Sequence, residues 1–249
     1  MSINSAADWK GLRRVARIAR LTLDALERAT AAGITTAELD GLAARIFTQH
    51  GARSAPATVY GFPGTVLISI NDEIVHGVPG VRRVVAGDLV KLDVTVEKDG
   101  YVADAARTVA VGPVTETARG LLECAEAAFE AGLRVARAGI RVNEIGRAVS
   151  DEVHRRGFSV IRGLTGHGVG RTIHEEPPVP NEFDPRQQDV LSDGLVLTIE
   201  PMISAGSTRH VQKADGWTLA TRDGSLSAHY EHTLVITTGL PIVLTRPAA

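Results

Sequence analysis

The sequence of 249 residues contains a single cysteine, Cys124. Disulfides within the chain and a metal site built from several thiolates are therefore excluded. A chain without disulfides is typical of a reducing compartment, so we expect a cytoplasmic protein. The first residues, MSINSAADWKGLRRVAR, lack the continuous apolar core of a signal peptide, and no segment has the roughly 18 to 20 apolar residues of a membrane span. We expect no membrane partner.

The sequence also lacks a long run of charge of one sign. Its 27 Lys and Arg residues nearly balance 29 Asp and Glu residues, for a formal net charge of −2. The short basic segments near Arg13 and Arg155 lie in helical patterns and are typical of solvated helix faces. We therefore expect no nucleic-acid partner. The remaining composition, 44% hydrophobic and 22% charged, is that of a globular protein with a sizeable core.

Two pairs of helices are predicted. Apolar residues recur at helical spacing over about 8–32, and a second helix follows with a capping-box pair, Thr35 and Glu38, and a glycine stop at Gly51. The segment AGITTAELDGLAARIFTQHG from Ala32 aligns without a gap with AGIRVNEIGRAVSDEVHRRG from Ala138, which a helical stretch over about 115–138 precedes. Chance similarity between amphipathic helices is the alternative, but the matched boundaries favour an internal duplication. We predict one domain over residues 1–249, with halves at about 8–112 and 115–245.

Strand-like segments follow each helix pair. The first half contains VLISI from Val66, LVKLDVTVE from Leu89 and YVADAARTVAV from Tyr101. The second half contains SVIRG from Ser159, LVLTIEPMI from Leu195, a run around 216–220 and YEHTLVITT from Tyr230. Strands that arrive as hairpins while helices arrive in pairs indicate an α+β fold with an antiparallel sheet, and not a parallel βαβ sheet. We expect a cleft between the halves.

The hairpin of the first half brings two acids together. Asp99-Gly100 is a two-residue turn signal, which pairs Thr95 with Asp104. Asp93 lies two residues from Thr95 and so shares a sheet face with Asp104, diagonally across the pair. Converging carboxylates repel each other unless one takes a proton or a divalent cation lies between them. Solvent-exposed acids on a hairpin are the alternative reading of this segment alone.

Two further acids and three histidines extend this pattern. Glu200 and Glu231 lie at the ends of apolar strands, where glutamate is rare unless it has a partner or points to water. They match Asp93 and Asp104 in the order of the two halves. His167, in the glycine-rich stretch GLTGHGVGRTIHEEPPVPN that we expect to be a flexible loop, adds a nitrogen ligand. Such an oxygen-rich set suits a pair of Mn, Fe, Co or Zn ions. His76 and His174 should flank the ions from opposite halves and bind substrate or transfer protons.

Five segments, INDEIVHGVPG, LDVTVEKDGYVADAART, GHGVGRTIHEEPPVPN, TIEPMI and DGWTLATRDGSLSAHYEHT, closely resemble those of type I methionine aminopeptidases, in the same order and over essentially the whole chain. The resemblance implies the pita-bread fold and two divalent ions per chain (Co, Mn, Fe, Zn or Ni). The implied metal ligands are Asp93, Asp104, His167, Glu200 and Glu231, with Asp104 and Glu231 bridging. His76 would lie near the scissile nitrogen and His174 near the carbonyl oxygen, while Glu200 carries a proton to the leaving amine.

The same resemblance implies a substrate. Phe62, Leu67 and Trp217, with Val59 as a neighbour, would surround the first side chain of the substrate. The implied activity is removal of the N-terminal methionine from nascent polypeptides when the second residue is small. We expect a monomer, with contact to the ribosome left open. Val75, Phe62 and Leu67 stand where cysteine, tyrosine and cysteine are common in bacterial members, and these changes affect pocket shape and inhibitor sensitivity, not the chemistry.

Two alternatives stay open at this point. The first is another enzyme of the same fold, such as an X-Pro aminopeptidase or dipeptidase. The second is a non-catalytic binding protein that kept the fold. Such a binding protein would be expected to have lost metal ligands, and none of the five is missing.

Overall fold

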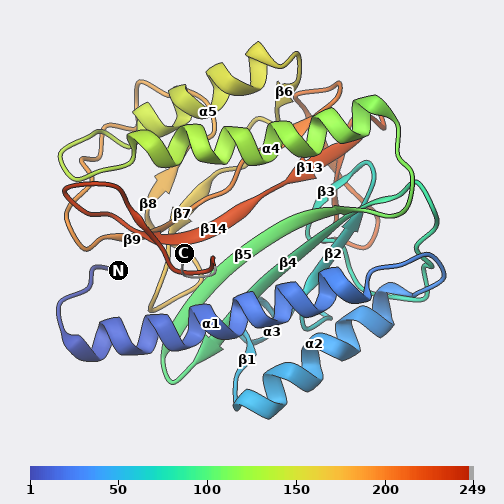
Figure 1. Ribbon diagram of the computed structural model, residues 1–249, viewed down its shortest axis with the longest axis horizontal. Coiled ribbons are helices and arrows are strands. Elements are labelled where there is room, and N and C mark those ends of the chain that lie inside the picture. Colours follow the sequence, from blue (N-terminus) through green and yellow to red (C-terminus); the bar gives the residue numbers. More distant parts are fainter. Residues whose placement is uncertain (247–249) are drawn as a thin grey trace.

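One nine-stranded antiparallel sheet runs through both halves of the chain in the computed structural model, which describes residues 1–246 (Figure 1). Its strand order is β1-β4-β5-β14-β9-β7-β8, with β2 paired to β4 and β15 paired to β14. These strands are β1 (Arg53–Ser54), β2 (Leu67–Ile70), β4 (Leu89–Lys98), β5 (Tyr101–Ala110), β7 (Gly166–Gly168), β8 (Glu175–Val179), β9 (Val196–Ile199), β14 (Glu231–Val235) and β15 (Ile242–Val243). The predicted α+β class is confirmed.

Two three-stranded sheets complete the β structure. The first has the order β13-β10-β6 and the second the order β11-β12-β3. Their strands are β3 (Glu73–Val75), β6 (Ser159–Val160), β10 (Met202–Ser204), β11 (His210–Gln212), β12 (Leu219–Thr221) and β13 (Ser227–His229). The predicted strand around 216–220 is β12, which begins three residues later than Gly216.

Each half contributes a pair of helices on the same side of the large sheet (Figure 1). The pairs are α1 (Ala6–Ala29) with α2 (Thr36–His50), and α4 (Glu116–Val135) with α5 (Asn143–Arg155); a short helix, α3 (Ala55–Tyr60), follows β1. The capping box of Thr35 and Glu38 and the left-handed Gly51 delimit α2 as predicted. The N-cap of α5, Val142, makes no side-chain hydrogen bond, so the matching Glu144 forms no second capping box. That the halves arose by duplication stays a prediction.

The period of two along the strands decides which side chains meet the helices. In β4, Val90, Leu92, Val94 and Val96 join the core with α1 and α2. In β9 and β14, Leu197, Ile199 and Leu234 join the second core with α4 and α5. The intervening residues therefore point to the opposite face of the sheet, and these include the four acids nominated from the sequence.

The register of the first hairpin is the predicted one. Thr95 pairs with Asp104, Lys98 pairs with Tyr101, and Asp93 stands opposite Ala106. The halves join where β5 pairs with β14, with Glu231 opposite Ala106. Asp104 and Glu231 are thereby brought to neighbouring strands on one face.

The glycine-rich stretch around His167 is not the flexible loop that we expected. Gly166–Gly168 is strand β7, held between β8 and β9. A Cβ on Gly166 would lie 2.7 Å from the backbone oxygen of Thr198, and a Cβ on Gly168 would overlap the backbone oxygen of Glu176. Here glycine allows backbones to approach closely, and this tertiary requirement overrides its low strand propensity.

The predicted strand LVLTIEPMI is also divided. β9 ends at Ile199 in the large sheet, and β10 begins at Met202 in a different sheet. Pro201 has no N–H group and cannot continue a ladder of hydrogen bonds. Glu200 therefore lies at a bend between two sheets.

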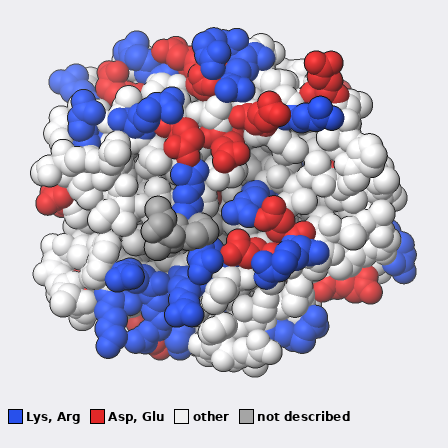
Figure 2. All heavy atoms as spheres, viewed as in Figure 1, with Lys and Arg blue, Asp and Glu red and all other residues white. Residues whose placement is uncertain are grey.

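The two basic segments lie on helix surfaces, as predicted. Lys10, Arg13, Arg14 and Arg17 are exposed on α1, where Figure 2 shows a group of basic side chains. At the end of α5, Arg155 and Arg156 pair with Glu152. Within residues 1–246, no helix is long and apolar enough to cross a membrane.

Adding one methyl group tests the role of the glycines. We expect Gly168→Ala to lower the free energy of unfolding by about 1–3 kcal/mol, because the new Cβ must push the backbone of β8 away. Gly41→Ala in α2 is the matched control, since its nearest neighbour would be Arg45 Nη1 at 3.5 Å, and it should be neutral or stabilise by about 0.5–1 kcal/mol. Urea unfolding of both variants measures the difference. Equal midpoints for the Gly168 variant and the native protein would contradict the close-approach argument.

Candidate metal centre and active site

A cavity of about 410 Å³ on the face opposite the helices contains the residues nominated from the sequence. Its lining includes the five candidate metal ligands Asp93, Asp104, His167, Glu200 and Glu231, together with His76, His174, Phe62, Leu67 and Trp217. Val59 is not among the lining residues; its side chain, on α3, is 54% exposed. The next residue of α3, Tyr60, lines the cavity, as do Pro56 and Ile173. Sequence patterns gave no sign of these three.

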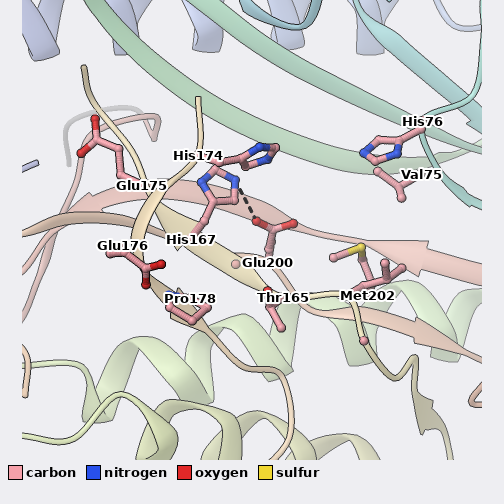
Figure 3. Close-up of a pocket in the computed structure, with 13 residues that line it drawn as sticks. Val75, His76, Thr165, His167, His174, Glu175, Glu176, Pro178, Glu200 and Met202 are labelled. Atoms are coloured by element: carbon pink, nitrogen blue, oxygen red, sulfur yellow. Dashed lines mark ion pairs between the residues drawn. The ribbon is translucent and has the colours of Figure 1, made fainter. Parts of the chain in front are cut away.

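The acids and His167 lie close enough to share a cation. One ligand atom each from Asp104, His167 and Glu231 can be chosen so that all lie within 4.8 Å of one another. His167 Nε2 lies 3.4 Å from Glu200 Oε1, the contact drawn in Figure 3, and 4.0 Å from Asp104 Oδ2. The ligand set thus combines β4 and β5 of one half with β7, β14 and the end of β9 of the other.

The ionisation of the four acids is strongly perturbed. Burial, followed by the negative charges of neighbouring carboxylates, raises the pKa of Asp93 and of Glu231 well above the ordinary values. Burial and the charge of Asp104 do the same to the pKa of Glu200. Burial also raises the pKa of Asp104 to about 6. In the absence of a positive partner, these groups cannot all be ionised together without a large cost.

Unpaired oxygens show that the residues fit a divalent centre. Within residues 1–246, Asp93 Oδ1, Asp104 Oδ1 and Glu231 Oε1 are buried and have no hydrogen-bond donor. Buried acceptors are rarely left unpaired, and an oxygen-rich set with one imidazole is the coordination that Mn, Fe, Co and Zn accept. The donor set therefore fits the divalent ions that the sequence led us to expect.

His167 is oriented as a neutral ligand. Its Nδ1 lies 2.9 Å from the backbone oxygen of Gly168, and since a carbonyl oxygen can only accept, Nδ1 carries the proton. Nε2 then presents its lone pair to the acids. Burial, with the charge of His174 adding to it, lowers the pKa of His167 to about 4, so the ring is uncharged near neutral pH.

Hydrogen bonds hold Glu200 from two directions. The Thr198 hydroxyl donates to Glu200 Oε1 at 2.7 Å, and Asn181 Nδ2 donates to the Glu200 backbone oxygen at 3.0 Å. Thr198 precedes Glu200 by two residues on the strand, so the period of two was the signal that could have found it. The backbone oxygen of Asp104 likewise accepts from the Thr233 hydroxyl at 2.8 Å.

The two flanking histidines approach from opposite halves. His76 has a left-handed backbone (φ 61°) and follows β3, while His174 precedes β8 beside His167 (Figure 3). Burial and the charge of His174 lower the pKa of His76 to about 4, and burial lowers the pKa of His174. The Tyr60 hydroxyl lies 2.6 Å from His174 Nδ1. Because these two residues are 114 positions apart, no local pattern in the sequence predicts their contact.

One wall of the cavity is apolar. The rings of Phe62 and Trp217 meet edge to face, with centroids 5.3 Å apart, and Phe62 and Leu67 are almost fully buried. Leu67 stands opposite Asp93 in the β2–β4 pair, so the wall adjoins the acids, and a bound molecule would place an apolar group against the wall and a polar group near the acids.

This sheet, with its helix pairs and its centre of four acids and one histidine, defines a metallohydrolase of the pita-bread fold. The model of metallopeptidase family M24 matches residues 10–238. The sequence is 41% identical to methionine aminopeptidase 2 of Bacillus subtilis, covering 99% of this chain and all of that one. The structure matches methionine aminopeptidase from Thermotoga maritima with a TM-score of 0.95 at 34% identity, covering 99% and 100% of the two chains. The chain belongs to family M24 and, within it, to the methionine aminopeptidases.

A more distant likeness concerns the fold alone. Prolidase from Pyrococcus furiosus is 21% identical, with a TM-score of 0.79 over 99% of this chain and 66% of that one. The pita-bread sheet is therefore shared with a protein whose name states a different specificity.

The acid cluster makes the stabilising effect of metal depend on pH. Because the pKa values of the acids are higher in the folded protein than in the unfolded chain, the acids stabilise the folded state below their unfolded-state pKa values, near pH 4. This contribution is lost as the pH rises through the folded-state pKa values, about 6 for Asp104. A bound cation offsets that loss. The increase in Tm on adding Mn²⁺ should therefore be larger at about pH 7.5 than at about pH 5.5. Calorimetric scans with and without Mn²⁺ measure it, and an equal increase at both pH values would contradict the assigned cluster.

Proposed function

We propose that the protein removes the N-terminal methionine from polypeptides whose second residue is small, by metal-dependent hydrolysis of the first peptide bond. The observation that carries this proposal is a buried cluster of four acids and one imidazole opening into a cavity with an apolar wall. Its relatives in Bacillus subtilis and Thermotoga maritima are named methionine aminopeptidases, which supports the same reading.

Two divalent ions are proposed, chosen from Co, Mn, Fe, Zn and Ni. Asp93, Asp104, His167, Glu200 and Glu231 would hold them, with Asp104 and Glu231 between the two. When bound, such ions acidify a water molecule, polarise the carbonyl of the scissile bond and attract the free α-amine of the substrate. The four carboxylates supply enough negative charge to balance both cations.

Glu200 is the proposed carrier of the proton. Its carboxylate lies at the bend between β9 and β10, beside His167 and lining the cavity. The raised pKa that results from burial and from the charge of Asp104 suits a group that takes a proton from water and passes it to the leaving amine. The hydrogen bond from Thr198 fixes one oxygen, which leaves the other for this role.

His174 is proposed to stabilise the developing oxyanion. Donation from the Tyr60 hydroxyl to Nδ1 leaves the proton of the neutral imidazole on Nε2, where it can hydrogen-bond to the carbonyl oxygen. Glu175 accepts hydrogen bonds from the backbone N–H groups of Arg171 and Thr172, which fixes the segment that carries His174. His76, approaching from the other half, would assist near the scissile nitrogen.

The apolar wall is proposed to select methionine. Phe62, Leu67 and Trp217 offer surface to an unbranched thioether, and the edge-to-face pair of aromatic rings leaves a slot of defined shape. Val75, which lines the same cavity, affects its shape and its sensitivity to inhibitors without touching the chemistry.

The substrates would be the N-termini of nascent polypeptides, met in the cytoplasm by a monomer without membrane or nucleic-acid partners. The single cysteine and the near balance of charge support this picture. Contact with the ribosome stays open.

An X-Pro peptidase is the second candidate, since prolidase shares the fold. A binding protein without activity is not favoured, because the five candidate ligands are all present and converge.

A panel of peptides tests the proposed activity. Met-Ala and Met-Ser peptides should release free methionine, Met-Lys and Met-Phe peptides should be cut poorly or not at all, and N-acetylated Met-Ala should be inert because its amine cannot approach the acids. Mass spectrometry of the products decides the outcome. A preference for X-Pro peptides over Met-Ala would replace this proposal with the second candidate.

Variants of the two neighbouring histidines should separate binding from chemistry. His167→Ala removes a proposed ligand and should weaken Mn²⁺ affinity by 10-fold or more, on the order of 1.4 kcal/mol. His174→Ala should lower kcat by about 10²-fold or more at nearly unchanged Mn²⁺ affinity. Titration calorimetry and steady-state kinetics on the same preparations measure both. If the two variants lost metal equally, the assigned roles would be wrong.

A further inference from the structure

His229 is a buried histidine to which the mechanism above gives no role. It ends β13, is 1% exposed, and within residues 1–246 neither of its ring nitrogens has a hydrogen-bond partner. Buried imidazoles almost always use at least one nitrogen, so the polar groups nearest to this ring indicate its role.

The ring lies beside two of the candidate metal ligands. Its Nε2 lies 3.7 Å from Glu200 Oε2 and 3.9 Å from Glu231 Oε2. Glu200 Oε1 already accepts from Thr198 and faces His167, so the contact of His229 is with the other oxygen of that carboxylate. A carboxylate oxygen has two lone pairs, so Oε2 of each acid can accept from His229 and still bind a cation.

The backbone of His229 is fixed on two sides. It pairs with Met202 of β10, and its N–H donates to the Thr108 hydroxyl, which donates in turn to the His229 backbone oxygen. The ring therefore projects from a rigid strand junction, and closing the gap to hydrogen-bond length requires a movement of under about 1 Å by the carboxylates.

We propose that His229 is a positioning residue of the metal centre, whose Nε2–H hydrogen-bonds to Glu200 Oε2 and Glu231 Oε2 and fixes both carboxylates for coordination. The inference rests on the proposed function only in taking these acids as metal ligands. Carboxylates are acceptors, so the proton of the ring belongs on Nε2. Hydrogen bonds of this kind orient ligands and strengthen metal binding.

Metal affinity tests the proposal without any peptide. Metal-free protein is titrated with Mn²⁺ by calorimetry, in the native form and as His229→Leu and His229→Gln. His229→Leu removes the donor and should weaken Mn²⁺ binding about 10- to 100-fold, whereas His229→Gln keeps an N–H and should stay within about 3-fold of native. The matched control is His232→Leu, a buried histidine whose Nδ1 lies 2.8 Å from Thr245 and whose ring packs on Phe129; it should leave affinity within about 3-fold even if it lowers stability.

The outcomes are distinct. Unchanged affinity in His229→Leu would overturn the proposal, and equal losses in the Leu and Gln variants would show that the imidazole itself coordinates or packs. Should His229→Leu fail to fold, His229→Asn replaces it, because the shorter amide keeps the polarity but cannot reach the carboxylates and should bind as weakly as a variant without a donor. Native affinity in that variant would also overturn the proposal. Absence of Mn²⁺ binding by the native protein would instead refute the proposed metal centre, and absence of methionine release would leave the His229 result intact.

Discussion

Four carboxylates buried around one imidazole are the constraint on which the rest of this structure depends. Asp93, Asp104, Glu200 and Glu231 are each less than 10% exposed, and three of them keep an oxygen that has no donor among residues 1–246. When ionised, such a cluster opposes folding unless a cation neutralises it, so the stability must come from elsewhere. The two apolar cores supply it on the other face of the sheet, where β4 packs under α1 and α2, and β9 and β14 pack under α4 and α5.

The pairing of β5 with β14, the seam between the two halves, holds the acids of both halves together. Glu231 pairs opposite Ala106 across β5 and β14, and the Thr233 hydroxyl both accepts from the Asp104 N–H and donates to its oxygen. A slip of one residue would turn every side chain of one strand to the other face and separate the acids. The apolar residues that alternate with the acids make such a slip costly, because they too would leave their cores. The alternation of apolar and acidic side chains along these strands therefore determines both the packing of the cores and the positions of the acids.

Local chemistry explains what the sequence could predict. The Asp99-Gly100 turn and the period of two place Asp93 beside Asp104 without tertiary information, and the observed register agrees. Close approach between distant segments has no such local signal. Gly166 and Gly168 suggested flexibility, yet they lie in a strand. Glycine is needed at these positions because neighbouring backbones leave no room for a Cβ. Tyr60 and His174 belong to opposite halves, so their contact depends on how the halves pack. His229 and Glu200 lie 29 residues apart in the second half, and no local pattern brings them together either.

Specificity and chemistry reside in different parts of this site. Prolidase shares the sheet at 21% identity, so the pita-bread fold alone does not determine which peptide is cut. In this chain the acids belong to the strands of the large sheet or to its margin, where their positions are tied to the register. Phe62 and Trp217 instead lie just outside α3 and β12, in segments that are not part of the seam between β5 and β14. Substitution of the aromatic wall should thus change the side chain that is accepted, whereas substitution of the acids should remove the reaction itself.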